Sequence, residues 1–368
     1  MSDPIFSKIS SFLKIPYSII VVGKNKACSS EAIFSVLSQY FKTRKLKSIS
    51  RFDLLRSDII ILEAQNIERA EMLIKRSKIP ILVVTALGDI PPEVDFFASE
   101  LDQAKPIIRL AQKIPSFGFL VLNFDDETVR DIKNKSSANV FTFGFQEGAD
   151  FRATDLKLNG GTNFKINYKG NVVPVWLERI FGKEQIYSAL ASASVGEILK
   201  LNLVKVSEGL KEYRSLPGKM RLIEGQKNSW ILDDSESATA FSMIEALLIL
   251  KKIDLEKISP SFLTSKRKIA VLGDVIGIGK YTIEAHETIG EKVSECADLL
   301  FTIGPRAKFI ARGALEKGMP QEKIFQFDTI QEAIQSLREE ISQGDLILVD
   351  GSREMQMQKI VNALKKEK

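Results

Sequence analysis

Three segments in the last third of the sequence place polar side chains directly after an apolar run. They read WILDDSESATAFSM (230–243), IAVLGDVIGIGKYTIEAHETIG (269–290) and ILVDGSREMQM (347–357). Because open α/β sheets bind ligands beyond the carboxyl ends of their strands, these side chains are candidates for a binding site. Backbone N–H groups and Arg353 at the last strand-to-helix turn suit a carboxylate or a phosphate. The alternative for Ser352 is that it only caps the last helix.

The elements that would position these residues alternate between strands and helices. Apolar runs such as SIIVV (18–22) and DIIILE (58–63) are typical of strands buried on both faces. This alternation predicts an α/β fold of two mostly parallel sheets with right-handed crossovers. Further strands are expected over 80–85, 118–123, 229–233, 267–272, 298–303 and 345–349, and helices over 29–41, 66–77, 98–113, 184–199, 203–213, 239–252, 282–296, 305–316, 330–341 and 353–365.

The pattern changes at 139–176, where strand-like segments are separated by Gly and Asn. We expect antiparallel strands added to the first sheet there. A helix ends at LPGKM (216–220), which marks a domain boundary. The sequence therefore predicts an N-terminal amphipathic helix over 1–16, an α/β domain over 17–216 and a second α/β domain over 217–368.

Composition excludes several classes of protein. The 368 residues are 44% hydrophobic and 27% charged, with a net charge of +5, which is ordinary for a globular protein and argues against nucleic-acid binding. The basic cluster at 42–51 is typical of a solvated helix end and loop rather than an anion site. No apolar run approaches the ~20 residues of a membrane span, and the N-terminus lacks the order of a secretory signal. The single His excludes a multi-His metal site, and two distant cysteines predict a reducing cytoplasm.

The three C-terminal segments together resemble the Mur ligase family. In order and spacing they are similar to the DDSYNANPxSM, VLGDMLELG…H and LVKGSR stretches of that family. Within the family, the resemblance is strongest to the branch that adds D-alanyl-D-alanine to a UDP-N-acetylmuramoyl peptide. The resemblance implies a Rossmann-like domain that presents the incoming amino acid or dipeptide. It implies nucleotide binding by Asp234, catalysis by His286, and substrate binding by Asp274, Ser352 and Arg353.

The resemblance extends to the first α/β domain, which is similar to the central, P-loop-like ATPase domain of that family. Glu63 matches the strand-end Glu that binds Mg²⁺, and Lys105 matches the lysine that is carbamylated and bridges metal. Asn123, Asp125 and Asp126, in VLNFDD, match the strand-end pattern beside the nucleotide. ATP and Mg²⁺ are therefore the implied cofactors.

The phosphate loop departs from the family pattern. Where the family has TGxxGKTT, this chain reads VGKNKACSS, so that Gly23 remains but the loop lysine falls on Ala27. That lysine neutralises the β- and γ-phosphates, and the hydroxyl after it holds Mg²⁺. Here Lys24 or Lys26 would have to reach a phosphate from a shifted loop, and Ser29 would offer the hydroxyl.

Other family positions change as well. Lys219 stands where the family has the Arg of PGRM, and Asp350 replaces the Lys of KGSR, which reverses the charge. Because the first ATPase strand begins near residue 18, the family's N-terminal UDP-sugar domain is expected to be absent.

Two functions follow from this mixture of retained and changed positions. The first is a divergent Mur ligase homologue of peptidoglycan precursor synthesis with impaired or lost ATP-driven catalysis. The alternative is an active ATP-dependent acid–amino-acid ligase that uses a rebuilt phosphate loop and a precursor site supplied by a partner. Both imply a cell-wall precursor or a D-Ala-D-Ala-like molecule as ligand, and another cell-wall enzyme is a candidate partner.

Overall fold

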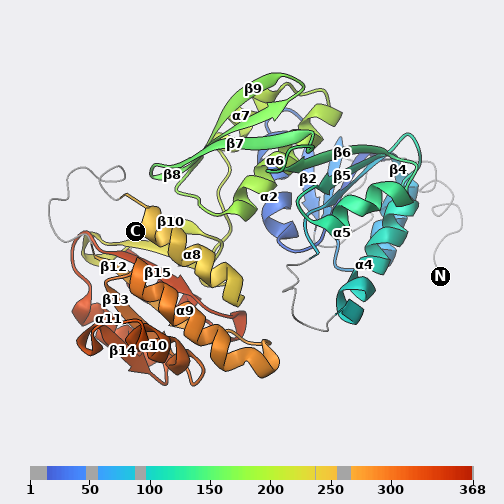
Figure 1. Ribbon diagram of the computed structural model, residues 1–368. Coiled ribbons are helices and arrows are strands. Elements are labelled where there is room, and N and C mark those ends of the chain that lie inside the picture. The colour runs from blue at the N-terminus through green and yellow to red at the C-terminus, as the bar shows by residue number, and fades with distance from the viewer. Residues whose placement is uncertain (1–14, 47–56, 88–96, 237, 255–266, 367–368) are drawn as a thin grey trace, which may run out of the picture. The chain divides into compact units, whose positions relative to one another are not determined.

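A computed structural model describes residues 15–46, 57–87, 97–236, 238–254 and 267–366. These divide into two compact units, shown together in Figure 1. Residues 157–162, 177–182 and 215 onward form the second unit, and the first unit takes in the rest. The expected helix over 1–16 falls outside the described residues, except that Ile15 and Pro16 already belong to the first strand. None of the helices in the described ranges has the length and apolar character that crossing a bilayer requires.

The first sheet has nine strands in the order β2-β3-β1-β4-β5-β6-β7-β8-β9. Pairing from β2 across to β7 is parallel. Its central strands are buried on both faces, as their continuous Ile, Val and Leu runs predict. The strands are β1 (Ile15–Val22), β2 (Thr43–Leu46), β3 (Ile59–Glu63), β4 (Ser77–Val84), β5 (Phe119–Asn123), β6 (Asn139–Gly144), β7 (Phe151–Leu158), β8 (Gly161–Tyr168) and β9 (Asn171–Glu178).

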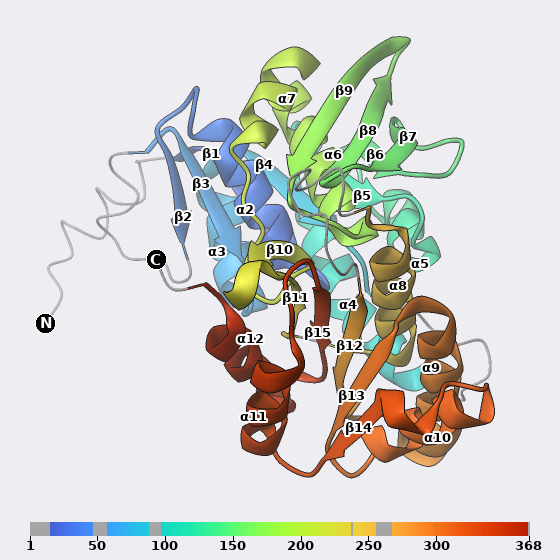
Figure 2. The same cartoon turned by 90° about the vertical axis from the view of Figure 1, so that its left-hand side faces the viewer.

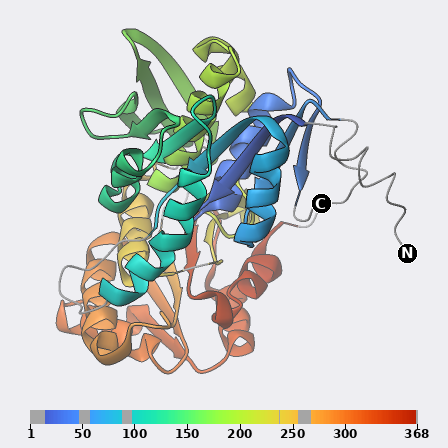
Figure 3. The ribbon, with the colours of Figure 1, turned by 90° about the vertical axis from the view of Figure 1, so that its right-hand side faces the viewer.

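Helices cover both faces of this sheet. On one face α3 (Ile67–Arg76) and α4 (Phe97–Gln112) lie side by side and bury alternate residues of the central strands, as Figure 3 shows. On the other face α2 (Lys26–Leu37) packs along α6 (Lys183–Ile198). The remaining helices of this unit are α5 (Glu127–Arg130), the 3₁₀ turn η2 (Asp131–Lys135) and α7 (Leu203–Lys211).

The second sheet has six strands in the order β10-β11-β15-β12-β13-β14. Only the edge strand β10 is antiparallel to its neighbour. Three helices, α8 to α10, pack on one face, and α11 and α12 pack on the other, as Figure 2 shows. The elements are β10 (Arg221–Glu224), β11 (Trp230–Asp234), α8 (Ala240–Lys252), β12 (Lys268–Gly273), α9 (Thr282–Cys296), β13 (Leu299–Ile303), α10 (Ala307–Glu316), β14 (Ile324–Phe327), α11 (Ile330–Glu340), β15 (Leu346–Asp350) and α12 (Gln358–Leu364), with the 3₁₀ turns η3 (Gln226–Asn228), η5 (Gly279–Tyr281), η6 (Gln321–Lys323) and η7 (Arg353–Met355).

The α/β fold class predicted from the sequence is confirmed, with one correction inside the segment at 139–176. Strand β6 pairs in parallel with β5, because α5 and η2 form a crossover between them, and β7 pairs in parallel with β6 over two residue pairs. The expected hairpins begin only after β7. Between β8 and β9 the turn residues Lys169 and Gly170 both have positive φ (47° and 79°), which is the conformation of a two-residue type I′ turn.

Candidate functional site

In the first unit, a loop of only three residues joins β1 to α2. Gly23 and Asn25 both adopt positive φ (101° and 57°). The N–H of Lys24 donates to the Ala86 carbonyl (2.7 Å), and the Thr85 hydroxyl donates to the Lys24 carbonyl. A Cβ at Gly23 would lie 2.6 Å from the Ala86 oxygen. The loop is therefore pressed against the residues that follow β4 and is held there by its own backbone groups.

Lys26 and Ser29, in the first turns of α2, are the side chains that would contact phosphate and Mg²⁺ in a phosphate loop. Both make hydrogen bonds within the first unit. The Lys26 ammonium donates to the Ala64 carbonyl (2.7 Å), just beyond β3. The Ser29 side chain is buried, and its hydroxyl lies 3.1 Å from that of Ser188 on α6. Ser29 is thus part of the helix–helix contact rather than of an open surface.

Glu63, the last residue of β3, is paired with Lys45, which belongs to the basic cluster at 42–51 and lies on β2 rather than in a solvated loop. The Lys45 ammonium lies 3.8 Å from Glu63 Oε1 and also contacts the Glu31 carboxylate. The three side chains are between 13% and 27% exposed. The sequence does not predict this pairing of Lys45, because the partners of a lysine leave no periodic signal in a sequence. Lys47 and Arg51 of that cluster lie outside the described residues.

The strand-end carboxylates after β5 have structural hydrogen bonds. Asp126 accepts from Leu87 N–H (2.8 Å) and from Val129 N–H (2.9 Å), so it caps α5 and fastens the segment after β4. Asp125 accepts from two backbone N–H groups at 145–146 and from the Tyr187 hydroxyl (2.9 Å). Asn123 is buried and accepts from the N–H of Asp125 (3.0 Å).

Lys105 lies on an exposed position of α4. The structure thus brings Gly23, Lys24, Lys26 and Glu63 to the carboxyl edge of the central strands.

In the second unit, the predicted residues Asp274 and Ser352 belong to one hydrogen-bonded network at the strand ends. One Asp274 oxygen accepts from the N–H groups of Arg306 and Ala307 (2.9 and 2.8 Å) at the start of α10. The Ser352 hydroxyl accepts from Ile276 N–H (2.8 Å), and its own N–H donates to the Asp274 carbonyl (3.0 Å). Ser352 therefore joins two strand-end loops instead of capping the last helix through its side chain.

His286 is fully buried, and both of its ring nitrogens have partners. The N–H of Val275 donates to Nε2 (3.1 Å), so Nδ1 carries the ring proton and donates to the Thr282 carbonyl (2.6 Å). Burial lowers the pKa of His286, and the nearby positive charge of Arg306 acts in the same direction, whereas Asp274 opposes it. The neutral ring fixes the loop after β12 onto α9.

Arg353 is an exposed charge at this edge. Its side chain is 82% exposed, and its Nε lies 3.9 Å from a Glu236 oxygen at the turn after β11. Lys219 is half-buried, and its charge acts on the buried Asp350 carboxyl. Asp234 is 8% exposed at the end of β11. An exposed guanidinium suits a carboxylate or a phosphate, because it offers parallel N–H donors.

Two family models match the chain. The Mur ligase middle domain matches residues 38–196, and the Mur ligase glutamate ligase domain matches residues 220–353. The chain belongs to the Mur ligase family. The two domain matches lie in order along most of its length, as the resemblance in the sequence implied.

Relatives and solved structures agree with this assignment. The UDP-N-acetylmuramoyl-tripeptide–D-alanyl-D-alanine ligase of Bacillus subtilis is 26% identical over 63% of this chain and 49% of its own length. A UDP-N-acetylmuramate–L-alanine ligase of Persephonella marina is 26% identical over 53% of this chain and 39% of its own. The chain thus spans about half or less of these curated relatives.

The fold is shared with solved MurF structures at low sequence identity. MurF from Acinetobacter baumannii is 19% identical and superimposes with a TM-score of 0.77 over 96% of this chain and 77% of its own. MurF ligase from Thermotoga maritima in complex with ADP is 17% identical, with a TM-score of 0.71 over 98% of this chain and 82% of its own.

The residues of the first unit do not fit the Mg²⁺ and phosphate groups that the family implies. A metal at Glu63 would meet the Lys45 ammonium, and the Ser29 hydroxyl is buried against Ser188. At the loop-lysine position Ala27 offers no charge, and Gly23 is closed against Ala86.

Proposed function

We propose that this chain is a divergent Mur ligase homologue of peptidoglycan precursor synthesis that has lost ATP-driven amide-bond formation. The observation that carries the proposal is the loop between β1 and α2. Its middle residue, Lys24, is hydrogen-bonded through its backbone to Thr85 and Ala86 after β4. The flanking Lys26 and Ser29 side chains are hydrogen-bonded to Ala64 and Ser188. Binding a triphosphate there would require these internal contacts to break first.

The magnitude of the loss follows from how this kind of reaction is catalysed. Phosphoryl transfer relies on positioning and charge neutralisation, and removing one such electrostatic group commonly costs about 3–4 kcal/mol of transition-state stabilisation. Here the lysine position is Ala27, and the Ser29 hydroxyl and the Glu63 carboxylate each have an internal partner. The loss of phosphate or Mg²⁺ contacts at these three positions is larger than the stabilisation that one lysine in a shifted loop, such as Lys24, can supply.

The second unit supports a retained binding role. Arg353 is exposed at the carboxyl edge of the sheet, while Asp274, Ser352 and His286 hold the surrounding loops by hydrogen bonds. A rigid edge with one exposed guanidinium suits a ligand that carries a carboxylate. We infer that its ligand is a cell-wall precursor peptide or a D-Ala-D-Ala-like dipeptide.

Titration calorimetry with Mg·ATP tests the catalytic part of the proposal. We expect no binding heat and no thermal shift at millimolar ATP. Micromolar binding that Glu63→Ala abolishes would overturn the proposal and favour the alternative, an active ligase with a rebuilt phosphate loop and a partner-supplied precursor site.

A second titration, with D-alanyl-D-alanine, tests the binding role. Arg353→Ala is expected to weaken binding at least tenfold, since a charge-assisted hydrogen bond contributes about 1.5–3 kcal/mol. The matched control is Lys359→Ala, which removes another exposed charge from the same unit. Equal affinity in the two variants, or no binding by the unmodified chain, would refute the role of this edge.

A further inference from the structure

Lys45 reaches a pair of carboxylates that come from two other elements. Strand β2 runs parallel to β3, with Lys45 opposite Ile61. From there the Lys45 ammonium contacts Glu31, in the second turn of α2, and lies 3.8 Å from Glu63 Oε1 at the end of β3. The single Lys45 ammonium is therefore close to two acidic side chains that are far apart in the sequence.

The exposed fractions indicate that this contact is not an ordinary surface ion pair. The side chains of Lys45, Glu31 and Glu63 are 23%, 27% and 13% exposed, so water screens their charges only in part. Without the ammonium, the Glu31 and Glu63 carboxylates would lose the cation that both of them approach. Because carboxylates close to one another repel, another cation would then be favoured at this edge of the sheet.

The chemistry of that cation follows from the ligands. Carboxylate oxygens are preferred ligands of Mg²⁺ and Ca²⁺. Among the described residues, no group of three or more His, Cys, Asp or Glu side chains is placed to hold a metal ion, so this pair has no third acidic ligand there. The Ser29 hydroxyl is bonded to Ser188 and does not complete a site.

We propose that Lys45 is a built-in counter-cation, whose ammonium takes the place of a divalent metal ion between Glu31 and Glu63 and makes this unit independent of such ions. The inference deepens the proposed function. The experiment that tests it uses no nucleotide. A negative result would therefore contradict the role of Lys45 without deciding whether the chain binds Mg·ATP.

The experiment compares the full chain with Lys45→Met by thermal unfolding, in EDTA and with Mg²⁺, Mn²⁺ or Ca²⁺ added. We expect no metal response from the unmodified chain. In EDTA, Lys45→Met is expected to lower Tm by about 2–4 °C, the shift that a loss of one partly buried ion-pair cluster produces in a unit of this size. Divalent ions should restore Tm with a midpoint on the order of millimolar.

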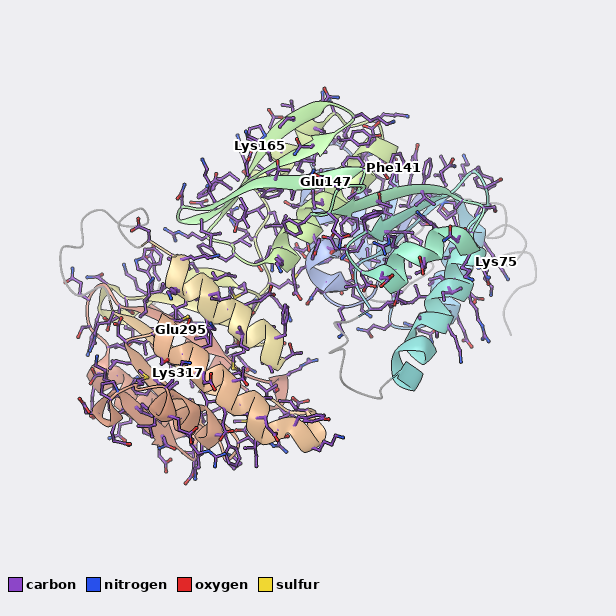
Figure 4. The ribbon with its side chains drawn as sticks, viewed as in Figure 1. Lys75, Phe141, Glu147, Lys165, Glu295 and Lys317 are labelled. Carbon is purple, nitrogen blue, oxygen red and sulfur yellow. The ribbon has the colours of Figure 1, made fainter. Side chains whose placement is uncertain are left out.

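Two further variants make the result decisive. The double variant Lys45→Met/Glu31→Gln should lose the metal response, because one carboxylate remains. Lys75→Met removes an exposed lysine of α3, labelled in Figure 4, and should change neither Tm nor the response. If Lys45→Met does not fold in EDTA, recovery of its circular dichroism with metal is the expected result.

Two outcomes would overturn the inference. The first is an unmodified chain that gains stability from divalent ions as strongly as Lys45→Met does. The second is a Lys45→Met chain that responds to none of the three metals, whether it is folded or not.

Discussion

Asp234 and Asp350 are register partners at the carboxyl ends of the adjacent parallel strands β11 and β15. Asp350 is fully buried, and neither of its carboxyl oxygens has a hydrogen-bond partner. Burial raises the pKa of Asp350 well above its ordinary value, and the negative charge of Asp234 raises it further, while the nearby backbone N–H of Gly351 and the charge of Lys219 act in the opposite direction. Asp350 stands where the family has a lysine, and this change therefore places two carboxyl groups, those of Asp234 and Asp350, next to each other inside the second unit.

Replacing this unpartnered acid should stabilise the protein. Asp350→Leu is expected to raise the free energy of unfolding by about 1–3 kcal/mol at pH 8, because a buried polar group without a partner is removed. Urea unfolding followed by circular dichroism measures the change.

A second buried aspartate, directly before β15, provides the matched control. Asp345 is equally buried but accepts two hydrogen bonds from Arg267 (2.8 and 3.1 Å). Asp345→Leu should destabilise the protein by about 3 kcal/mol, since it leaves the Arg267 charge without this partner. A loss of stability in both variants would contradict the account of Asp350.

Asp350 should also give stability a distinctive pH dependence. A group whose pKa is raised on folding contributes stability below its unfolded pKa, here 3.8, and that contribution is lost as the pH rises through the folded value. The difference in unfolding free energy between Asp350→Asn and the unmodified chain should therefore grow from pH 4 upward. Parallel profiles for the two proteins would show that the pKa is not raised.

His286 should act in the opposite direction. Its pKa is lowered by burial, so the stability that depends on the neutral ring is present above the ordinary value of 6.5 and is lost as the pH falls. His286→Ala is expected to cost about 2–4 kcal/mol at pH 8, because Val275 N–H and the Thr282 carbonyl lose their partner. Measured by urea unfolding, this cost should shrink below pH 6.5. A constant cost from pH 5 to 8 would mean that the ring does not titrate differently on folding.

The close contact between α9 and α10 should tolerate no side chain at its glycines. A Cβ on Gly290 would lie 2.0 Å from the Ile310 carbonyl oxygen, and one on Gly313 would lie 2.2 Å from that of Glu287. Gly290→Ala is expected to destabilise the protein by about 2–3 kcal/mol, despite the better helix propensity of Ala. Thr288→Ala, at an exposed position of the same helix, is the control and should stay within about 0.5 kcal/mol. Equal melting temperatures would show that the helices can separate without cost.

Most of the strands could be predicted because buried parallel strands are continuous apolar runs. The runs at 58–63 and 118–123 correspond to β3 and β5 within one residue. The first helix begins three residues earlier than expected, at Lys26, because the loop before it is so short. The parallel pairing of β6 and β7 was not predicted, since Gly and Asn between strand-like segments mark turns but do not give the direction of pairing.

The family, the α/β class and the charge changes at Ala27 and Asp350 were determined by the sequence alone, because residue type and local spacing carry them. Whether a polar side chain at a strand end is open to a ligand was decided only by the tertiary structure. Ser29 meets Ser188 across 159 positions of sequence, and Asp126 meets Leu87 across 39. A hydrogen bond depends on distance in space rather than on spacing along the chain, so only the folded protein shows which of these groups already have a partner.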